Sequence, residues 1–316
     1  MCKFTLNGKK VFVAGHTGMV GSAICDELQT YENVQLVNRP RQQLDLMCPN
    51  QVVNFFASEK PQVVFFAAAK VGGIVANMTY PADFIYQNLT IQNNIIHNAY
   101  VHGVGKLVFL ASSAIYPKNA VNPIPETALL SGCLDSSNDA YSVAKIAGIK
   151  MCQAYRQQYG FDAITAIPCN LYGYGDRYHP QHSHVLPSLI RRFYEAKIND
   201  KPSVAIWGTG TVRREFLFSK DAGKGIVFAC ENYSDMTPIN VGYGTDITIA
   251  DLAYTIKQVI GYTGEVIFDT TKPEGVMRKL MDSTIINNMG WSPTYDIYTG
   301  IQMAYEDFLS AHDVKN

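Results

Sequence analysis

Residues 11–24 read VFVAGHTGMVGSAI, a short apolar run followed by three evenly spaced glycines and then a helix-like pattern. Glycine lets the chain turn tightly after a strand and brings the backbone close to a bound pyrophosphate. The helix that follows turns free N–H groups and its positive dipole end toward the same phosphates. Because the turn lies between a strand and a helix, it predicts a dinucleotide site, with a merely structural turn as the alternative. The residues predicted to contact the cofactor here are Gly15, Thr17, Gly18, Met19, Val20 and Gly21.

Short apolar or β-branched runs alternate with helical patterns along the first half of the chain. The runs cover residues 10–14, 34–37, 63–67, 107–111 and 163–167. Such alternation predicts an α/β fold, a Rossmann-type doubly wound parallel sheet with helices on both faces, followed by a smaller C-terminal substrate-binding α/β lobe. We expect the dinucleotide-binding domain over residues 1–170, with a segment near 211–245 returning to it, and the lobe mainly over 171–316.

Composition narrows the class of protein. The chain has 316 residues, of which 47% are hydrophobic and 17% charged, enough to bury a large core. A formal net charge of -1 gives no reason to expect a nucleic-acid or membrane partner. Without a signal-peptide pattern or a long apolar run, we expect a cytoplasmic protein. The seven cysteines are scattered without zinc-binding spacing, so we expect free thiols and no metal site.

The end of the second predicted strand indicates which dinucleotide is bound. It reads Leu-Val-Asn-Arg over residues 36–39, where an acidic residue would hold the ribose 2′-hydroxyl of NAD. Arg39 instead suits a 2′-phosphate, so NADP is predicted, with an ordinary solvated arginine as the alternative. Asp45 and Leu46 follow in a loop that could hold the adenine.

A serine and a tyrosine–lysine pair suggest chemistry at the sheet edge. Ser112 ends a predicted strand, and ligands of open α/β sheets bind outside the carboxyl ends of the strands. Tyr141 and Lys145 are four residues apart, so they share one face of a helix. A neighbouring ammonium and a cationic nicotinamide would both favour the ionised phenol. The pair could then give a proton to a carbonyl oxygen while hydride reaches the carbon, although this spacing also occurs by chance.

Longer strings over nearly the whole chain carry a family resemblance. They are AAAKVGGI (67–74), YPADFIYQN (80–88), AKIAGIK (144–150), NLYG (170–173), SHV (183–185), WGTG (207–210) and REFL (214–217). In these strings the chain resembles the extended short-chain dehydrogenases/reductases and, among them, the GDP-L-fucose synthases, which act with NADPH on GDP-4-keto-6-deoxymannose. The resemblance implies a GDP-4-keto sugar as substrate, NADP(H) as cofactor and a homodimer built on helices around residues 81–100 and 141–159.

The resemblance also implies roles for individual residues. Ser112, Tyr141 and Lys145 are implied to form the reductive triad, with His184 as a further acid–base group. The residues implied to lie near the cofactor are Ala67, Ala69, Asn170 and His184. The residues implied to face the GDP-sugar are Ser113, His184, Arg192, Trp207 and Arg214.

The chemistry of these residues suits their implied roles. The planar guanidinium of Arg214 matches a diphosphate, and Trp207 offers a flat face to guanine or a sugar. A core position for Trp207, a solvated position for Arg192 and a structural His184 are the alternatives.

Two positions depart from the fucose synthases. Thr17 stands where an arginine is usual, so the predicted preference for NADP rests mainly on Arg39. Ala114 stands where the fucose synthases carry cysteine, and a methyl group can neither take nor give a proton. Reduction at C4 needs only hydride and the proton of Tyr141. We therefore expect an NADPH-dependent C4-ketoreductase of a GDP-4-keto, 6-deoxy sugar that has lost its epimerase activity.

Other functions stay open at this point. One is a bifunctional 3,5-epimerase/4-reductase in which Cys169 or Cys133 replaces the missing thiol. Others are a redox-neutral nucleotide-sugar epimerase or dehydratase and a non-catalytic dinucleotide-binding regulator. The intact triad counts against the regulator, and the lack of an acid pair at residues 114–115 counts against the dehydratase. Hexose and heptose substrates are both possible.

Overall fold

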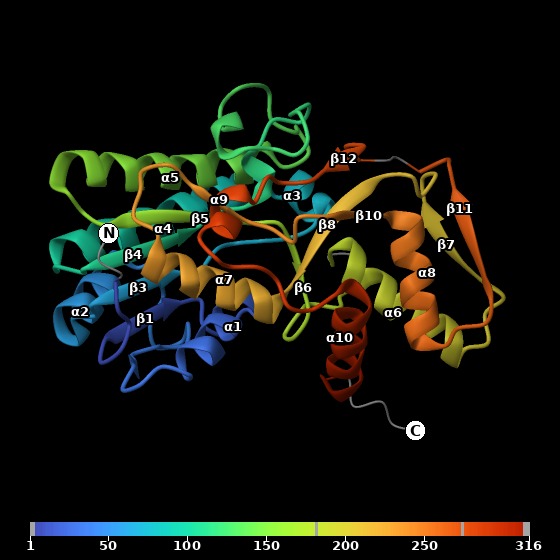
Figure 1. Cartoon of the computed structure of the whole chain (residues 1–316), viewed down its shortest axis with the longest axis horizontal. Coiled ribbons are helices and arrows are strands. Elements are labelled where there is room, and N and C mark those ends of the chain that lie inside the picture. The colour runs from blue at the N-terminus through green and yellow to red at the C-terminus, as the bar shows by residue number, and fades with distance from the viewer. Residues whose placement is uncertain (1–3, 181–182, 273–274, 312–316) are drawn as a thin grey trace.

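The computed structural model describes residues 4–180, 183–272 and 275–311. Through the first half of the chain, strands alternate with helices (Figure 1). The strands are β1 (Lys10–Ala14), β2 (Gln35–Leu36), β3 (Val63–Phe66), β4 (Lys106–Leu110) and β5 (Ala163–Pro168). The helices are α1 (Met19–Leu28), α2 (Pro49–Glu59), α3 (Ile74–Thr79), α4 (Pro81–Val101) and α5 (Asp139–Tyr159).

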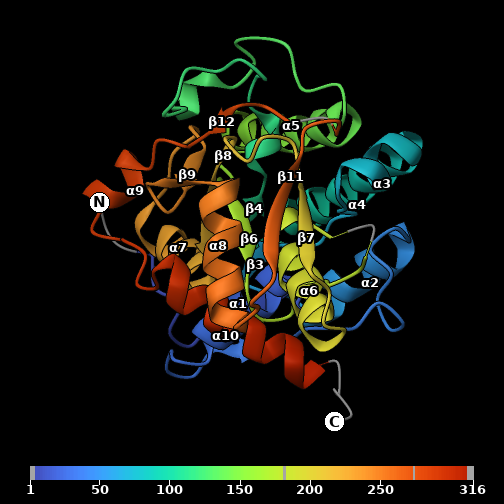
Figure 2. The same ribbon diagram turned by 90° about the vertical axis from the view of Figure 1, so that its right-hand side faces the viewer.

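These strands form a parallel sheet in the order β2-β1-β3-β4-β5-β9, to which β9 (Ile239–Val241) contributes the last strand. Helices α2, α4 and α5 pack on one face, and α1 and α7 (Ser219–Asn232) pack on the other (Figure 2). Strands β3 and β4 are buried along their whole length, as expected for a sheet covered on both faces. The predicted doubly wound α/β fold is confirmed.

The chain order of the strands reverses at β1, which lies between β2 and β3. In open α/β sheets this switch point marks the crevice where ligands bind, outside the carboxyl ends of the strands. The glycine turn follows β1 and the serine end follows β4, so both lie at the carboxyl edge of the sheet.

A second set of elements lies beside the sheet, at the right of Figure 1. Its strands are β6 (Asn170–Tyr172), β7 (Ser203–Trp207), β8 (Arg213–Phe218), β10 (Asp246–Thr248), β11 (Glu265–Asp269) and β12 (Arg278–Lys279). Its helices are α6 (Val185–Ile198), α8 (Ile249–Ile260) and α10 (Ile297–Ala311), whereas α9 (Thr284–Asn288) packs against β9 of the parallel sheet. Strand β8 pairs with β6, β10 and β12, while β7 pairs with β11. The division of the chain into a dinucleotide-binding domain and a substrate-binding lobe stays a prediction.

Close packing of α5 on β4 fixes the helix that carries Tyr141 and Lys145. A Cβ at Gly148 would lie 2.4 Å from the ring of Phe109 and 2.8 Å from the side-chain oxygen of Gln92. Glycine at this position therefore lets α5 approach both β4 and α4. Within the described ranges, no helix combines the length and the apolarity needed to cross a membrane.

Candidate active site

The glycine turn packs directly against the loop after β3. Gly15 has a φ of +85°, and a Cβ there would lie 2.7 Å from the backbone nitrogen of Ala68. A Cβ at Gly21 would lie 2.1 Å from the carbonyl oxygen of Gly15. Both positions thus require glycine, because any side chain would push the turn away from its neighbours.

The first turn of α1 presents unpaired amides at this edge. Gly18 is the N-cap residue and supplies no side-chain cap. Across the part of the chain that the structure describes, no acceptor is found for the backbone N–H groups of Thr17, Met19, Val20 and Gly21. Free amides at a helix N-terminus, in a cradle that glycine keeps open, fit the pyrophosphate of a dinucleotide.

Arg39 follows β2 at the same edge of the sheet, but it has a partner there. Its guanidinium donates to the Glu59 carboxylate at 2.6 Å and to the Asn38 carbonyl at 2.9 Å. Its side chain is 38% exposed, so a ligand can still reach it. Glu59, which also pairs with Lys10 at 3.0 Å, therefore competes with any phosphate for Arg39.

The other residues predicted to contact the cofactor lie in loops at this side of the sheet. The Asp45 carboxylate accepts the amide of Met47 at 3.0 Å, and the carbonyl of Leu46 accepts the side chain of Asn94 at 2.9 Å. The amide of Ala67 donates to the carbonyl of Ala14 at 2.9 Å, which places the segment with Ala69 directly after β3 beside the glycine turn.

Ser112 lies just beyond β4 and caps a short 3₁₀ turn over residues 113–115. Its hydroxyl oxygen accepts the amide of Ala114 at 3.3 Å. The carbonyl of Ala114 in turn accepts the hydroxyl of Ser142, a fully buried residue of α5, at 3.0 Å. The backbone amide and carbonyl of Ala114 therefore hold the turn, whereas the side chain of Ala114 carries no polar atom.

The structure brings the three predicted triad residues together. The Tyr141 phenol hydrogen-bonds with Ser112, and Lys145 donates from its Nζ to the Leu110 carbonyl at 2.7 Å. Burial raises the pKa of Tyr141 to about 12, and only the bond with Ser112 opposes this rise. Burial also lowers the pKa of Lys145 to about 7, with the charge of Cys152 acting in the opposite direction.

The expectation that the Lys145 ammonium favours an ionised phenol is not met among the protein's own groups. Desolvation outweighs other influences on Tyr141, and the ammonium is turned to the strand carbonyl. A phenol with a raised pKa keeps its proton at neutral pH. Tyr141 therefore carries its proton at neutral pH, and burial makes it a weaker acid than a phenol in water.

The residues predicted to bind substrate come from the turn after β4 and from the second set of elements. Ser113 is buried, and His184 is exposed at the N-cap of α6. The guanidinium of Arg192 donates to the Ala205 carbonyl, and Trp207 ends β7 with 57% of its surface exposed. The high exposure of Trp207 rules out the alternative of a core position.

Arg214 is part of β8, and Asn170 binds the same strand. Arg214 donates to the Val276 carbonyl at 2.6 Å, and burial lowers the pKa of its guanidinium. The side-chain amide of Asn170 donates to the main-chain carbonyl of Glu215 at 2.9 Å. Asn170, which is predicted to lie near the cofactor, thus contacts β8, the strand that carries Arg214, the predicted ligand of the diphosphate.

Lys279 is a second cation beside Arg214 that the sequence pattern does not single out. The two residues are direct partners in the β12–β8 ladder, and their neighbours Arg278 and Arg213 are partners too. Arg213 and Arg278 both bind the Asp246 carboxylate, at 2.7 and 2.5 Å. Burial, followed by the charge of Arg214, lowers the pKa of Lys279 to about 8.

Comparisons with known proteins agree with this geometry. Residues 11–242 match the model of a family described as the NAD dependent epimerase/dehydratase family. The chain belongs to this family. It is an oxidoreductase of the extended short-chain dehydrogenase/reductase type, similar to GDP-L-fucose synthases.

Three relatives illustrate the similarity. GDP-L-fucose synthase 1 of Arabidopsis thaliana is 52% identical over 95% of this chain and 93% of its own length. A GDP-6-OMe-4-keto-L-xylo-heptose reductase from C. jejuni is 37% identical, with a TM-score of 0.91 over 98% of this chain and 99% of that one. MlghC, a GDP-mannoheptose C4 reductase from Campylobacter jejuni solved with NADP bound, is 39% identical, with a TM-score of 0.86 over 96% and 99%. The predicted cofactor, NADP(H), is thus confirmed at the level of the family.

The described ranges contain neither a metal-binding cluster nor a disulfide. No group of three or more His, Cys, Asp and Glu side chains there could hold a metal ion. The six described cysteines are free; Cys2 lies outside the described residues.

Replacing Arg39 with alanine should weaken binding of NADPH by about tenfold or more and change that of NADH little, because only NADPH carries a 2′-phosphate. Binding of both cofactors can be measured by fluorescence titration. The matched control is Glu59→Gln, which removes the competing carboxylate charge and should leave NADPH binding unchanged or tighter. Equal losses for both cofactors in Arg39→Ala would show that Arg39 does not contact that phosphate.

Replacing Tyr141 with phenylalanine should lower kcat by about 10²-fold or more, since it removes the proton donor but keeps the ring. The affinity for NADPH should change by no more than about twofold. Single-turnover kinetics measure the chemical step and titration measures NADPH binding, so the two effects can be separated. Tyr254→Phe, at an exposed position of α8, serves as the control and should leave kcat unchanged. Near wild-type turnover in Tyr141→Phe would contradict the triad assignment.

Proposed function

We propose that this chain is an NADPH-dependent C4-ketoreductase that acts on a GDP-4-keto sugar and has lost epimerase activity. The observation that carries the proposal is the side chain of Ala114, next to an intact set of Ser112, Tyr141 and Lys145. Epimerisation beside a C4 ketone requires a group that removes a proton from C3 or C5 and another that returns one. A methyl group cannot do either.

The residues of the chain account for reduction at C4. The protonated phenol of Tyr141 donates its proton to the carbonyl oxygen, and the Ser112 hydroxyl donates a hydrogen bond to the same oxygen. NADPH, when bound, supplies the hydride that reaches the carbonyl carbon. Lys145 lies beneath Tyr141 on the same helix face, where its Nζ–H groups hold α5 to the end of β4. The ketone becomes an alcohol with one hydride and one proton gained.

The GDP part of the substrate is assigned to the second set of elements. Arg214 and Lys279 supply two positive charges for the diphosphate, while Arg213 and Arg278 share the single carboxylate of Asp246. The exposed indole of Trp207 offers a stacking face for guanine. Ser113, His184 and Arg192 are proposed to contact the sugar, and Asn170 and His184 to lie near the nicotinamide.

Two relatives described above are named as reductases of GDP-heptoses, and a third is named as a GDP-L-fucose synthase. These names support a GDP-sugar and a reduction step. Both a GDP-hexose and a GDP-heptose are compatible with these names as the substrate of this chain.

A bifunctional epimerase/reductase is the alternative, with a cysteine elsewhere replacing the missing thiol. Cys169 is buried, its thiol faces the Asn170 carbonyl at 3.7 Å, and burial raises its pKa well above the usual value. A thiol that holds its proton so tightly is a poor base. Cys133 is exposed in the loop after residue 128, outside the turn that contains Ala114.

Hydrogen exchange in heavy water tests the loss of epimerase activity. With NADPH withheld, the C3 and C5 protons of a GDP-4-keto-6-deoxyhexose should exchange no faster with the protein than without it, as followed by NMR. Ala114→Cys restores the thiol and should introduce exchange, while Ala114→Ser is the matched control without a thiol. Rapid exchange at either carbon in the unmodified protein would support the bifunctional alternative instead.

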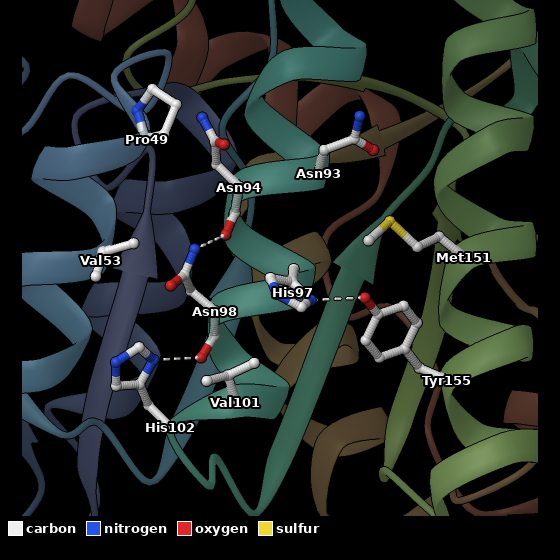
Figure 3. Close-up of a pocket in the computed structure, with 10 residues that line it drawn as sticks. All are labelled: Pro49, Val53, Asn93, Asn94, His97, Asn98, Val101, His102, Met151 and Tyr155. Atoms are coloured by element: carbon white, nitrogen blue, oxygen red, sulfur yellow. Dashed lines mark hydrogen bonds between the residues drawn. The ribbon is translucent and has the colours of Figure 1, made fainter.

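We also propose a homodimer formed through α4 and α5. From Phe84 to Val101, α4 carries no Asp, Glu, Lys or Arg, which is unusual for a helix with a solvent-exposed side. An open hollow of about 630 Å³ lies at this face, between α2, α4 and α5, and Figure 3 shows the residues that line it. In it, His97 of α4 hydrogen-bonds with Tyr155 of α5 at 2.8 Å. A stretch of α4 without charged residues that also exposes apolar side chains suits a self-complementary interface.

A charge placed in this face should break the dimer. Asn93 is exposed on α4 and lines the hollow, so Asn93→Glu would bring two like charges into a symmetric interface. Sedimentation equilibrium should then show the mass of a monomer. The control Gln258→Glu introduces the same negative charge at an exposed position of α8 and should keep the dimer. A dimer that persists in Asn93→Glu would place the interface elsewhere.

A further inference from the structure

Glu215 is a fully buried acidic residue in the middle of β8. Its carboxylate accepts the amide of Gly244 at 2.8 Å through Oε1 and the amide of Met281 at 3.1 Å through Oε2. Both donors are backbone groups, one in the loop after β9 and the other just beyond β12. One side chain therefore joins three segments that are distant in sequence.

The space around this carboxylate is closed. A Cβ at Gly242 would lie 2.4 Å from Oε1 of Glu215 and 2.6 Å from the hydroxyl oxygen of Ser283. The chain after β9 thus approaches the carboxylate as closely as glycine allows. Such packing leaves the carboxylate little freedom to move.

The segment that Glu215 fastens carries the proposed diphosphate ligands. Side chains alternate along a strand, so Arg214 projects from the face of β8 opposite Glu215. Arg214 is held by the Val276 carbonyl, and Lys279 is its partner in β12. Both contacts depend on the position of residues 276–281.

Other bonds also hold this segment, because the Met277 carbonyl accepts the amide of Arg213 at 2.8 Å and the amide of Leu280 donates to the side chain of Asn122 at 2.7 Å. Strand β12 is two residues long and pairs with β8 only at Arg278 and Lys279. Beyond it, the Leu280 carbonyl accepts the amide of Ile124 at 2.8 Å. The bond from Met281 to Glu215 adds a tie to β8 at the end of the segment, beyond the two residues of β12.

We infer that Glu215 is a positioning residue that sets the spacing of Arg214 and Lys279 for a nucleotide diphosphate. The inference rests on the proposed function, because it takes these two cations as the diphosphate ligands. Glu215 does not touch the substrate. Its carboxylate accepts hydrogen bonds from two backbone N–H groups. A glutamine at this position would turn its NH₂ donor toward one of these N–H groups and lose that hydrogen bond.

The test uses GDP as the probe, with NADP⁺ as the internal reference, in isothermal titration of the full chain. Glu215→Gln should weaken GDP binding by about tenfold or more and keep NADP⁺ binding within about twofold. In steady-state assays, KM for the GDP-sugar should rise while kcat changes little, since Tyr141 and Ser112 are untouched. The matched control is Glu231→Gln, which alters a carboxylate that accepts Leu6 and Tyr31 and should affect neither ligand.

A second variant covers the case in which Glu215→Gln does not fold. Gly242→Ala keeps the charge but pushes the carboxylate aside, and it should weaken GDP binding selectively as well. Equal loss of GDP and NADP⁺ in a folded variant, or no loss of GDP, would overturn the positioning role.

Two further measurements separate this inference from the proposed function. If the unmodified protein does not bind GDP, the nucleotide assignment fails and the inference falls with it. If Arg214→Ala loses GDP while Glu215→Gln keeps it, the diphosphate site stands and only the positioning role is overturned.

Discussion

The hydrogen bond from Lys145 to the Leu110 carbonyl joins α5 to the end of β4 inside the core, and the geometry of the site depends on it. Tyr141 lies one helical turn away on the same face, so its place beside Ser112 follows from this bond and from the close packing at Gly148. Because the pKa of Lys145 is lowered to about 7, both protonation states are present at neutral pH. Either state has an N–H to donate, so the helix keeps its position whatever the charge.

The turn that carries Ala114 is independent of its side chain. Ser112 and Ser142 bind the amide and the carbonyl of this residue, and any amino acid except proline supplies that amide. Exchange of a thiol for a methyl group at this position therefore changes the available chemistry without loosening the turn. Loss of a proton-transfer step and retention of a reduction step are compatible within one scaffold.

Much of the fold could be predicted because its signals are local. The glycine turn, the apolar strands and the Tyr141–Lys145 spacing each depend on neighbours in sequence, and β1 begins and ends at the residues predicted. The other predicted strands of the first half differ from the structure by one residue at one or both ends, where strand pairing decides the boundary.

The rest depends on contacts between distant segments. Strand β8 contains two arginines and a glutamate, so its sequence does not read as a buried strand. Lys279 becomes a candidate ligand only when β12 pairs with β8, and the partner of Arg39 comes from α2. The raised pKa of Tyr141 likewise reflects burial, which residue spacing cannot reveal.

The chain leaves the parallel sheet after β5, passes through β8, and returns with α7 and β9 before leaving again. During synthesis on a ribosome, the first 170 residues would therefore emerge without the helix that covers α1 and without the last strand of the sheet. A nascent chain could not complete its dinucleotide-binding half until residue 241 was available, so the two halves cannot fold as successive independent units.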